Sequence, residues 1–144
     1  MSLKQNFYQV LGYAGLIPFW GLAVGSFVID DPRFISTQLA YAAIILSFLG
    51  GAHWPRAVES KCPFYLVLTM LPSIFALGAF VAGLFYPAIA LGVFSLLFIA
   101  MFVMDKKFLK LDPMPDDYVR FRIILTVLVV LALTLTSFSS MSVS

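Results

Sequence analysis

Six side chains that could take part in ligand binding or proton transfer fall near the ends of apolar segments. They are His53, Trp54, Asp105, Tyr118, Arg120 and Arg122. Histidine changes its charge most readily near neutral pH, and arginine can hold a phosphate or carboxylate through two parallel hydrogen bonds. If the six lie together, they form a polar pocket suited to an anionic ligand such as a phosphate, a carboxylate or a lipid head group.

The charges around Asp105 predict a specific ion pair. Asp105 follows an apolar run that ends at Met104, so its carboxylate opposes the negative end of a helix dipole. Arg120 and Arg122 open the next apolar run, where the dipole disfavours a cation. We therefore predict that Asp105 pairs with Arg120 or Arg122. The alternative to a ligand site is a structural network that holds helix ends in register, since long side chains near a membrane interface reach water easily.

The residues present give little support to other site chemistry. His53 is the only histidine and Cys62 the only cysteine, whereas a structural zinc site needs four ligands. No metal and no cofactor is predicted. Nucleophilic catalysis would need a serine or cysteine beside His53 together with an orienting acid, but Ser47 is rotated away from His53 on a helix. A non-enzymatic role is therefore favoured over an enzymatic one, and the catalytic residues of an enzyme stay unknown.

The segments that must position these residues are apolar enough to cross a membrane. The 144-residue chain is 62% hydrophobic and 11% charged, whereas soluble domains are roughly a quarter charged. Its mean hydropathy is +1.01. We predict an all-α integral membrane bundle, a single domain over residues 1–144 with five transmembrane helices. Their predicted ranges are 7–29, 36–54, 63–84, 87–104 and 119–138.

The basic residues predict the orientation of these helices. If the segments alternate in direction, one side carries only Arg33 and the other carries the rest: Lys4, Arg56, Lys61, Lys106, Lys107, Lys110, Arg120 and Arg122. Because basic loops stay in the cytoplasm, we predict a cytoplasmic N-terminus, or one on the matrix side in an organelle, and a C-terminus outside. The net charge of +2 thus reflects topology and gives no support to nucleic-acid binding.

Small residues and prolines predict the helix packing. Gly21 and Gly25 have the spacing that lets membrane helices approach closely. Pro18 and Pro72 each remove one backbone hydrogen bond inside a span, which predicts a kink in each helix or, as a second hypothesis, a hydrated pocket opened by both kinks. The last segment lacks glycine and is expected to be the most lipid-exposed. A stripe on the second segment predicts that this helix is central: Ala40, Ala43, Ser47, Gly50, Gly51 and Trp54.

Several of these residues belong to segments that resemble a known family. The segments are GLIPF (15–19), YAAIILSFLGGAHW (41–54), LPS (71–73) and YVRFRIILT (118–126), together with Asp105. Over nearly its whole length the chain resembles the transmembrane protein 69 family, also called domain of unknown function 3429. The resemblance implies a small multi-span protein of the bacterial inner membrane, or of mitochondria in eukaryotes, and implies no established activity. Pro55 stands where the family pattern has glycine, so the resemblance does not predict how the second helix ends.

Three classes of function remain, in order of preference. The first is a non-catalytic accessory or ligand-binding protein with a cytoplasm-facing polar pocket. The second is a small-solute or proton-coupled transporter, which would need a continuous polar route, whereas the outer half of the spans offers mainly hydroxyl groups. The third is an enzyme that acts on a lipid or quinone head group. The expected partners are the lipid bilayer, a membrane protein or a second copy of the chain, and an anionic or lipid-like ligand.

Overall fold

The structure is a computed structural model that describes residues 3–29, 31–60, 62–111 and 116–143, without the side chains of 3–8, 56, 108–111, 116–118 and 143. Every regular element among the described residues is a helix, which confirms the all-α class. The elements include 5 helices long and apolar enough to cross a membrane. The helices are α1 (Leu3–Val28), α2 (Pro32–Gly51), α3 (Trp54–Glu59), α4 (Pro63–Gly83), α5 (Pro87–Leu111) and α6 (Asp116–Val143).

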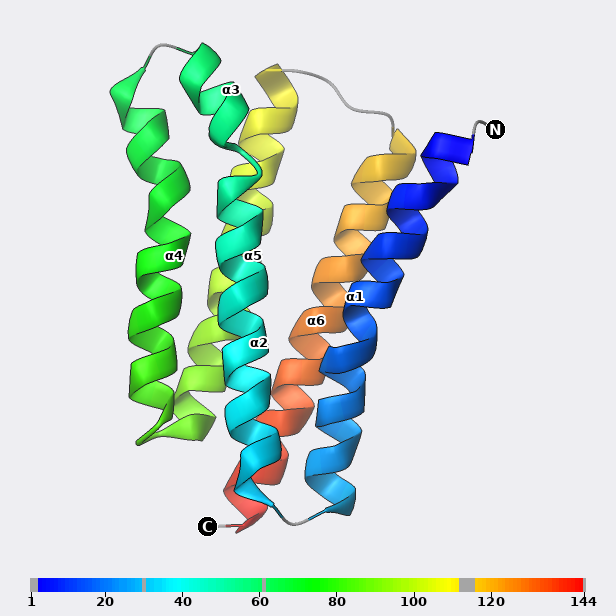
Figure 1. Ribbon diagram of the computed structural model, residues 1–144, viewed down its shortest axis with the longest axis vertical. Helices are drawn as coiled ribbons and strands as arrows, with labels where there is room; N and C mark the ends of the chain where they lie inside the picture. Colours follow the sequence, from blue (N-terminus) through cyan, green and yellow to red (C-terminus); the bar gives the residue numbers. More distant parts are fainter. Residues whose placement is uncertain (1–2, 30, 61, 112–115, 144) are drawn as a thin grey trace.

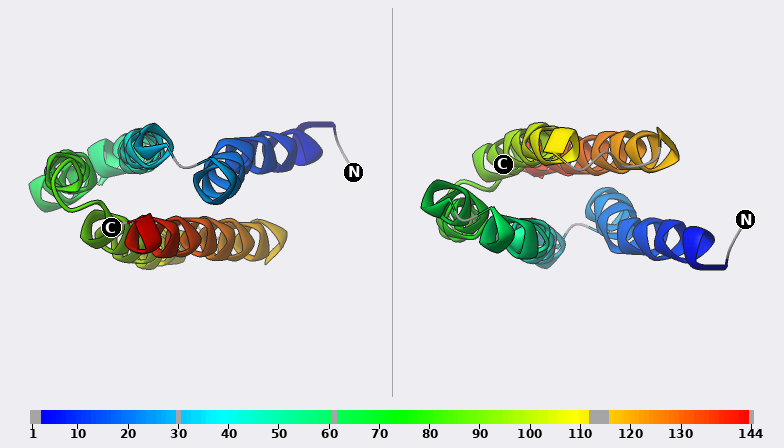
Figure 2. Two further views of the ribbon diagram at one scale, coloured as in Figure 1. Left: turned by 90° about the horizontal axis from the view of Figure 1, so that it is seen from below. Right: turned by 90° about the horizontal axis from the view of Figure 1, so that it is seen from above.

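The long helices run in alternating directions and form two layers. Figure 1 shows α3, the start of α1, the end of α5 and the start of α6 at one end of the bundle, which we call the α3 end. In Figure 2, α4, α2 and α1 form one layer and α5 and α6 form the other. Helix α2 contacts each of the other four long helices. The predicted central position of the second helix is therefore confirmed.

Prolines and one aspartate set the helix starts. Helices α2, α4 and α5 begin at Pro32, Pro63 and Pro87, a position where the missing N–H of proline costs nothing. Asp31 caps α2, because its Oδ1 accepts a hydrogen bond from the backbone N–H of Arg33 at 2.9 Å. Their side chains also form an ion pair at 2.7 Å. These hydrogen bonds from Arg33 lower the pKa of Asp31 below its ordinary value.

Two helix ends differ from the predicted spans. Helix α2 ends at Gly51 instead of Trp54, and α3 starts at Trp54 as a separate helix. The cause is Pro55, which has no N–H to donate to the carbonyl of Gly51, four residues earlier. Helix α5 continues to Leu111, beyond the predicted end at Met104, so Asp105 lies inside a helix and not at its end.

Glycines allow close helix contacts at only some of the predicted positions. A Cβ atom added to Gly50 would lie 2.8 Å from the backbone oxygen of Thr69, so α2 and α4 touch there without room for a side chain. At Gly25 an added Cβ would lie 2.6 Å from the Phe34 ring of α2. Gly21 and Gly51 have open space within 4 Å, and the close packing predicted for these two is wrong, because both face outward from the bundle.

The rest of the predicted stripe on α2 lines an open groove and not a closed seam. Ala40, Ala43 and Ser47 face α4 across a groove of about 430 Å³. Pro72 lies against Gly50, where the two helices meet. Helices α1 and α4 continue through Pro18 and Pro72 respectively. The kinks at these prolines, and a hydrated pocket opened by them, stay predictions.

Helix α6 is the most buried of the membrane-length helices, and the expectation that it is the most lipid-exposed was wrong. In its apolar window 39% of the residues are buried, against 17% in α4. Small and hydroxyl side chains replace glycine as the close-packing residues, because they are compact enough to let α6 pack against α5 and α1. The fully buried ones are Ala132, Thr136 and Ser139.

Candidate functional site

Three of the predicted polar residues form one cluster at the α3 end. His53 Nε2 contacts Asp105 Oδ1. Arg122 approaches the other carboxylate oxygen through Nε and Nη2, each 2.7 Å from Oδ2. The side chains of His53, Asp105 and Arg122 are 15%, 9% and 10% exposed. The predicted ion pair is therefore confirmed, with Arg122 as the partner of Asp105.

Each member of this cluster comes from a different part of the fold. His53 lies in the short break between α2 and α3, where its carbonyl accepts from the N–H of Ala57 at 3.1 Å and so starts α3. Asp105 lies on α5, and Arg122 lies in the second turn of α6. The interruption caused by Pro55 thus directs His53 toward α5. The cluster joins three segments that are far apart in the sequence.

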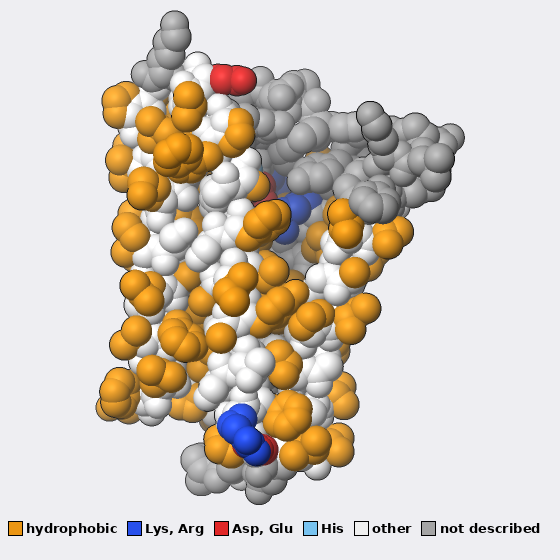
Figure 3. Space-filling model, in the orientation of Figure 1, with side chains coloured by type: hydrophobic (Ala, Val, Ile, Leu, Met, Phe, Trp, Pro, Cys, Tyr) orange, Lys and Arg blue, Asp and Glu red, His pale blue; other side chains and the backbone are white. Residues whose placement is uncertain are grey.

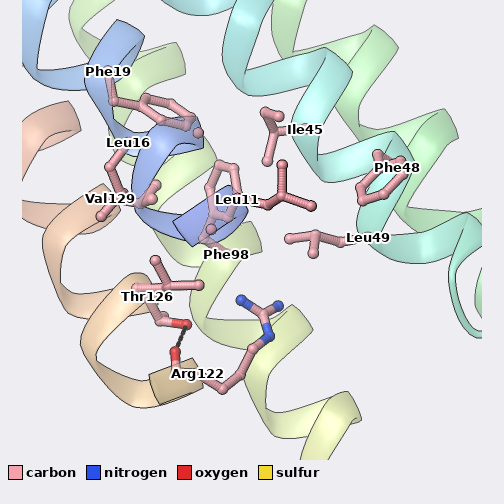
Figure 4. A pocket seen from close by; sticks show the side chains of 13 residues that line it. Leu11, Leu16, Phe19, Ile45, Phe48, Leu49, Phe98, Arg122, Thr126 and Val129 are labelled. Atoms are coloured by element: carbon pink, nitrogen blue, oxygen red, sulfur yellow. Dashed lines mark hydrogen bonds between the residues drawn. The ribbon is translucent and has the colours of Figure 1, made fainter. Parts of the chain in front are cut away.

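The cluster borders an apolar cavity between α1, α2, α5 and α6, shown in Figure 4. Its volume is about 180 Å³. In the space-filling view of Figure 3, basic and acidic side-chain atoms are visible inside a hollow of the molecular surface, toward the α3 end. Arg122 is the charged residue among the described residues that line the cavity. The others are Leu11, Gly12, Gly15, Leu16, Phe19, Ile45, Phe48, Leu49, Phe98, Leu125, Thr126 and Val129.

The other three residues predicted for the polar pocket are not seen in the cluster: two are exposed, and the side chain of the third is not described. Trp54 is 48% exposed, and Arg120, next to the buried Phe121, is exposed as well. The side chain of Tyr118 is among those that the structure does not describe. A clamp made of both arginines is therefore not assembled among the described residues, because positions two residues apart on a helix lie about 200° apart around its axis.

The burial of the glutamine Gln38 was not predicted from the sequence. Gln38 on α2 is fully buried, and its Nε2 donates to the carbonyl of Phe19 at 3.2 Å and to Thr136 Oγ1 at 3.4 Å. Its Oε1 has no hydrogen-bond partner among the described residues. The available signal was a glutamine inside an apolar run, since polar side chains in membrane helices usually face the bundle interior.

These features define a class of protein: a helical bundle of membrane-spanning length, with a buried ion-pair cluster near one end. The chain belongs to a protein family of unknown function, DUF3429, whose family model matches residues 5–138. The predicted family is thereby confirmed under that name, and the name transmembrane protein 69 is not tested by the match. No curated protein and no solved structure matches the chain.

Proposed function

We propose that this protein is a non-catalytic ligand-binding or accessory protein of the inner membrane, and that its ligand is a small amphiphilic molecule. One observation carries the proposal: Arg122 belongs both to the buried cluster with Asp105 and to the lining of an apolar cavity. A ligand with an apolar body and a polar head could occupy the cavity and reach the arginine. Binding pockets commonly combine apolar walls with one or a few polar groups that orient the ligand.

The competing explanation is that the cluster only ties helices together. A buried ion pair adds little net stability to a contact between helices, because the free energy lost by removing two charges from water offsets most of their attraction. Ionisable residues within membrane helices therefore often mark functional sites. A structural cluster also needs no empty space beside it, whereas Arg122 faces a cavity of about 180 Å³. This combination favours the ligand-binding proposal.

Retention of a small molecule during gentle extraction tests the proposal. Native mass spectrometry of the protein in lipid particles should show a bound molecule in the wild type. Thr126→Leu should lose it, because Thr126 lines the cavity and leucine fills part of that space. Thr134→Leu is the matched control: both threonines donate to the carbonyl four residues earlier on α6, but Thr134 is exposed. Equal retention by both variants would contradict a site in this cavity.

We also propose that the α3 end faces the cytoplasm, or the matrix in mitochondria. The support is the distribution of lysine and arginine, with Lys106 and Lys107 at the α3 end and Arg33 at the opposite end. Cys62, the only cysteine, occupies the N-cap position of α4 at the α3 end. An impermeant maleimide should label it only after intact bacterial cells are permeabilised. Labelling in intact cells would reverse the orientation; Ser142→Cys in a Cys62→Ser background should behave oppositely.

A second candidate function is solute or proton-coupled transport, which the buried Gln38 favours. It supplies a polar side chain in the half of the bundle away from the cluster, and its Nε2 bonds the carbonyl of Phe19, a residue that also lines the cavity. Saturable flux into proteoliposomes that disappears in His53→Ala or Asp105→Asn would favour transport. Variants that change only thermal stability, with no flux in the wild type, would leave the ligand-binding proposal in place.

A further inference from the structure

The charge balance of the cluster indicates what kind of head group the cavity accepts. Arg122 is already paired with Asp105 through Nε and Nη2. Arg120 is exposed, and Lys106 lies over the Phe102 ring, 5.6 Å from its centroid. The positive charge of Arg122, which lines the cavity, is thus already paired with a carboxylate, whose other oxygen contacts His53. An anionic head group would have to compete with Asp105 for Arg122 or stay without a close cation in an apolar space, which is costly, whereas a neutral acceptor would do neither.

Arg122 retains a donor for such an acceptor. Its described contacts to Asp105 use Nε and Nη2, and guanidinium carries five N–H groups in all. Figure 4 shows the guanidinium group directed toward the space beside Leu49 and Phe98. A carbonyl oxygen placed in this space could accept a hydrogen bond from Nη1 without breaking the pair with Asp105. This hydrogen bond would be charge-assisted and therefore stronger than one between neutral groups.

The size and lining of the cavity favour a single ring. Its volume of about 180 Å³ is close to that of an engineered cavity of about 150 Å³ that binds benzene, and below the range of about 300–1,000 Å³ for drug-sized ligands. Three aromatic side chains, Phe19, Phe48 and Phe98, line it. Leu11 and Phe48 are 58% and 70% exposed, so the cavity opens between α1 and α2 on the outer surface of the bundle, which would contact lipid in a membrane. A tail attached to the ring can leave by that route.

We infer that the ligand is a quinone-type lipid, with its ring in the cavity, a carbonyl oxygen on Arg122 and its tail in the bilayer between α1 and α2. The inference rests on the proposed ligand-binding function and adds the class of ligand. The competing class is a single-chain acid, whose carboxylate would have to displace Asp105 from Arg122.

Three probes with tails of similar length separate these classes: a decyl-substituted benzoquinone, decanoic acid and decylbenzene. Each is equilibrated with purified full-length protein in lipid nanodiscs, and the bound probe is quantified after separation. The quinone should bind saturably at one molecule per protein. Decanoate and decylbenzene should bind at least about tenfold more weakly, because one adds a charge and the other lacks the acceptor oxygen. Thr126→Leu should abolish quinone binding, and Thr134→Leu should keep it.

The outcomes separate this inference from the proposal on which it rests. Decanoate binding that equals or exceeds quinone binding and is lost in Thr126→Leu would overturn the quinone class and leave the ligand-binding function intact. Equal binding of decylbenzene and the quinone would overturn the role of Arg122. Quinone binding that persists in Thr126→Leu would overturn the placement of the ring in the cavity. If no probe binds, the quinone class fails, and the mass spectrum of the native protein decides the proposed function separately.

Discussion

The two halves of the bundle bury polar side chains in different ways. At the α3 end, His53, Asp105 and Arg122 form a compact ionic cluster beside a cavity. In the opposite half, neutral groups form separate hydrogen bonds between helices: Gln38 reaches Phe19 and Thr136, and the Ser139 hydroxyl donates to the Ser26 carbonyl at 2.8 Å. Both halves connect distant helices, but among the described residues only the first buries formal charges.

This difference separates two uses of buried polarity. Interhelical hydrogen bonds between neutral groups in membrane proteins are worth about 0.6 kcal/mol on average, so the Gln38 half can lose one at small cost. A buried charge that loses its partner costs several times more. We therefore expect substitutions in the ionic half to have large and coupled effects, and those in the neutral half to have small and separate ones.

Removing the carboxylate should have the largest effect. Asp105→Ala leaves Arg122 buried without its counter-ion, and should lower the free energy of unfolding by about 3–5 kcal/mol. Unfolding in mixed micelles of mild detergent and SDS measures this quantity. The double variant Asp105→Leu with Arg122→Leu should recover most of the loss, because the buried carboxylate and guanidinium are removed together. A loss in the single variant similar to that of a neutral hydrogen bond would remove the contrast between the halves.

A substitution at the close contact of α2 with α4 should have the next largest effect on stability. It tests the contribution of packing in the ionic half without changing a charge. Gly50→Leu should lower the free energy of unfolding by about 1–3 kcal/mol, because its Cβ would lie 2.8 Å from the backbone oxygen of Thr69. Gly51→Leu is the matched control and should change it by less than about 0.5 kcal/mol, since space there is open. Equal effects at the two glycines would contradict the close approach at Gly50. The same SDS titration measures both.

A smaller effect is expected from the neutral half. Gln38→Leu should lower the free energy of unfolding by about 0.5–1 kcal/mol, because it removes two long hydrogen bonds but also an Oε1 that has no partner among the described residues. Thr136→Val, which removes only the hydroxyl partner, should cost less. If Gln38→Leu destabilised the bundle as strongly as Asp105→Ala, the neutral bonds would carry far more stability than the average predicts.

The smallest effect is expected at Asp31, the partly exposed cap of α2. Hydrogen bonds from Arg33 lower its pKa below the ordinary value of 3.8, so its carboxylate stabilises the fold above that value, and this contribution disappears as the pH falls through the lowered pKa. The difference in unfolding free energy between wild type and Asp31→Asn, followed by SDS titration, should therefore shrink as the pH falls below 3.8. A difference that grows on acidification would contradict the direction of the shift.

The amino-acid sequence by itself determined the helical class, the five membrane-length segments and the pairing of Asp105 with an arginine of the last helix. Hydropathy over about 20 residues can be summed from the sequence alone. A segment that is apolar over this length is expected to be a helix, because the backbone of a membrane helix satisfies its own hydrogen bonds. The charges of Asp105 and Arg122 could be matched in advance because few ionisable groups occur within the spans. The family could also be identified from local motifs, as the match over residues 5–138 confirms.

Only the tertiary structure decided which side chains meet. The choice of Arg122 over Arg120, the burial of Gln38 and the open space at Gly51 depend on the rotation of each helix about its axis. Neighbouring helices set this rotation through packing, and the hydropathy of a nearly uniform apolar segment carries little information about it. The burial of α6 was misjudged for the same reason. The cavity beside Arg122 also required the structure, because it is formed by four helices together.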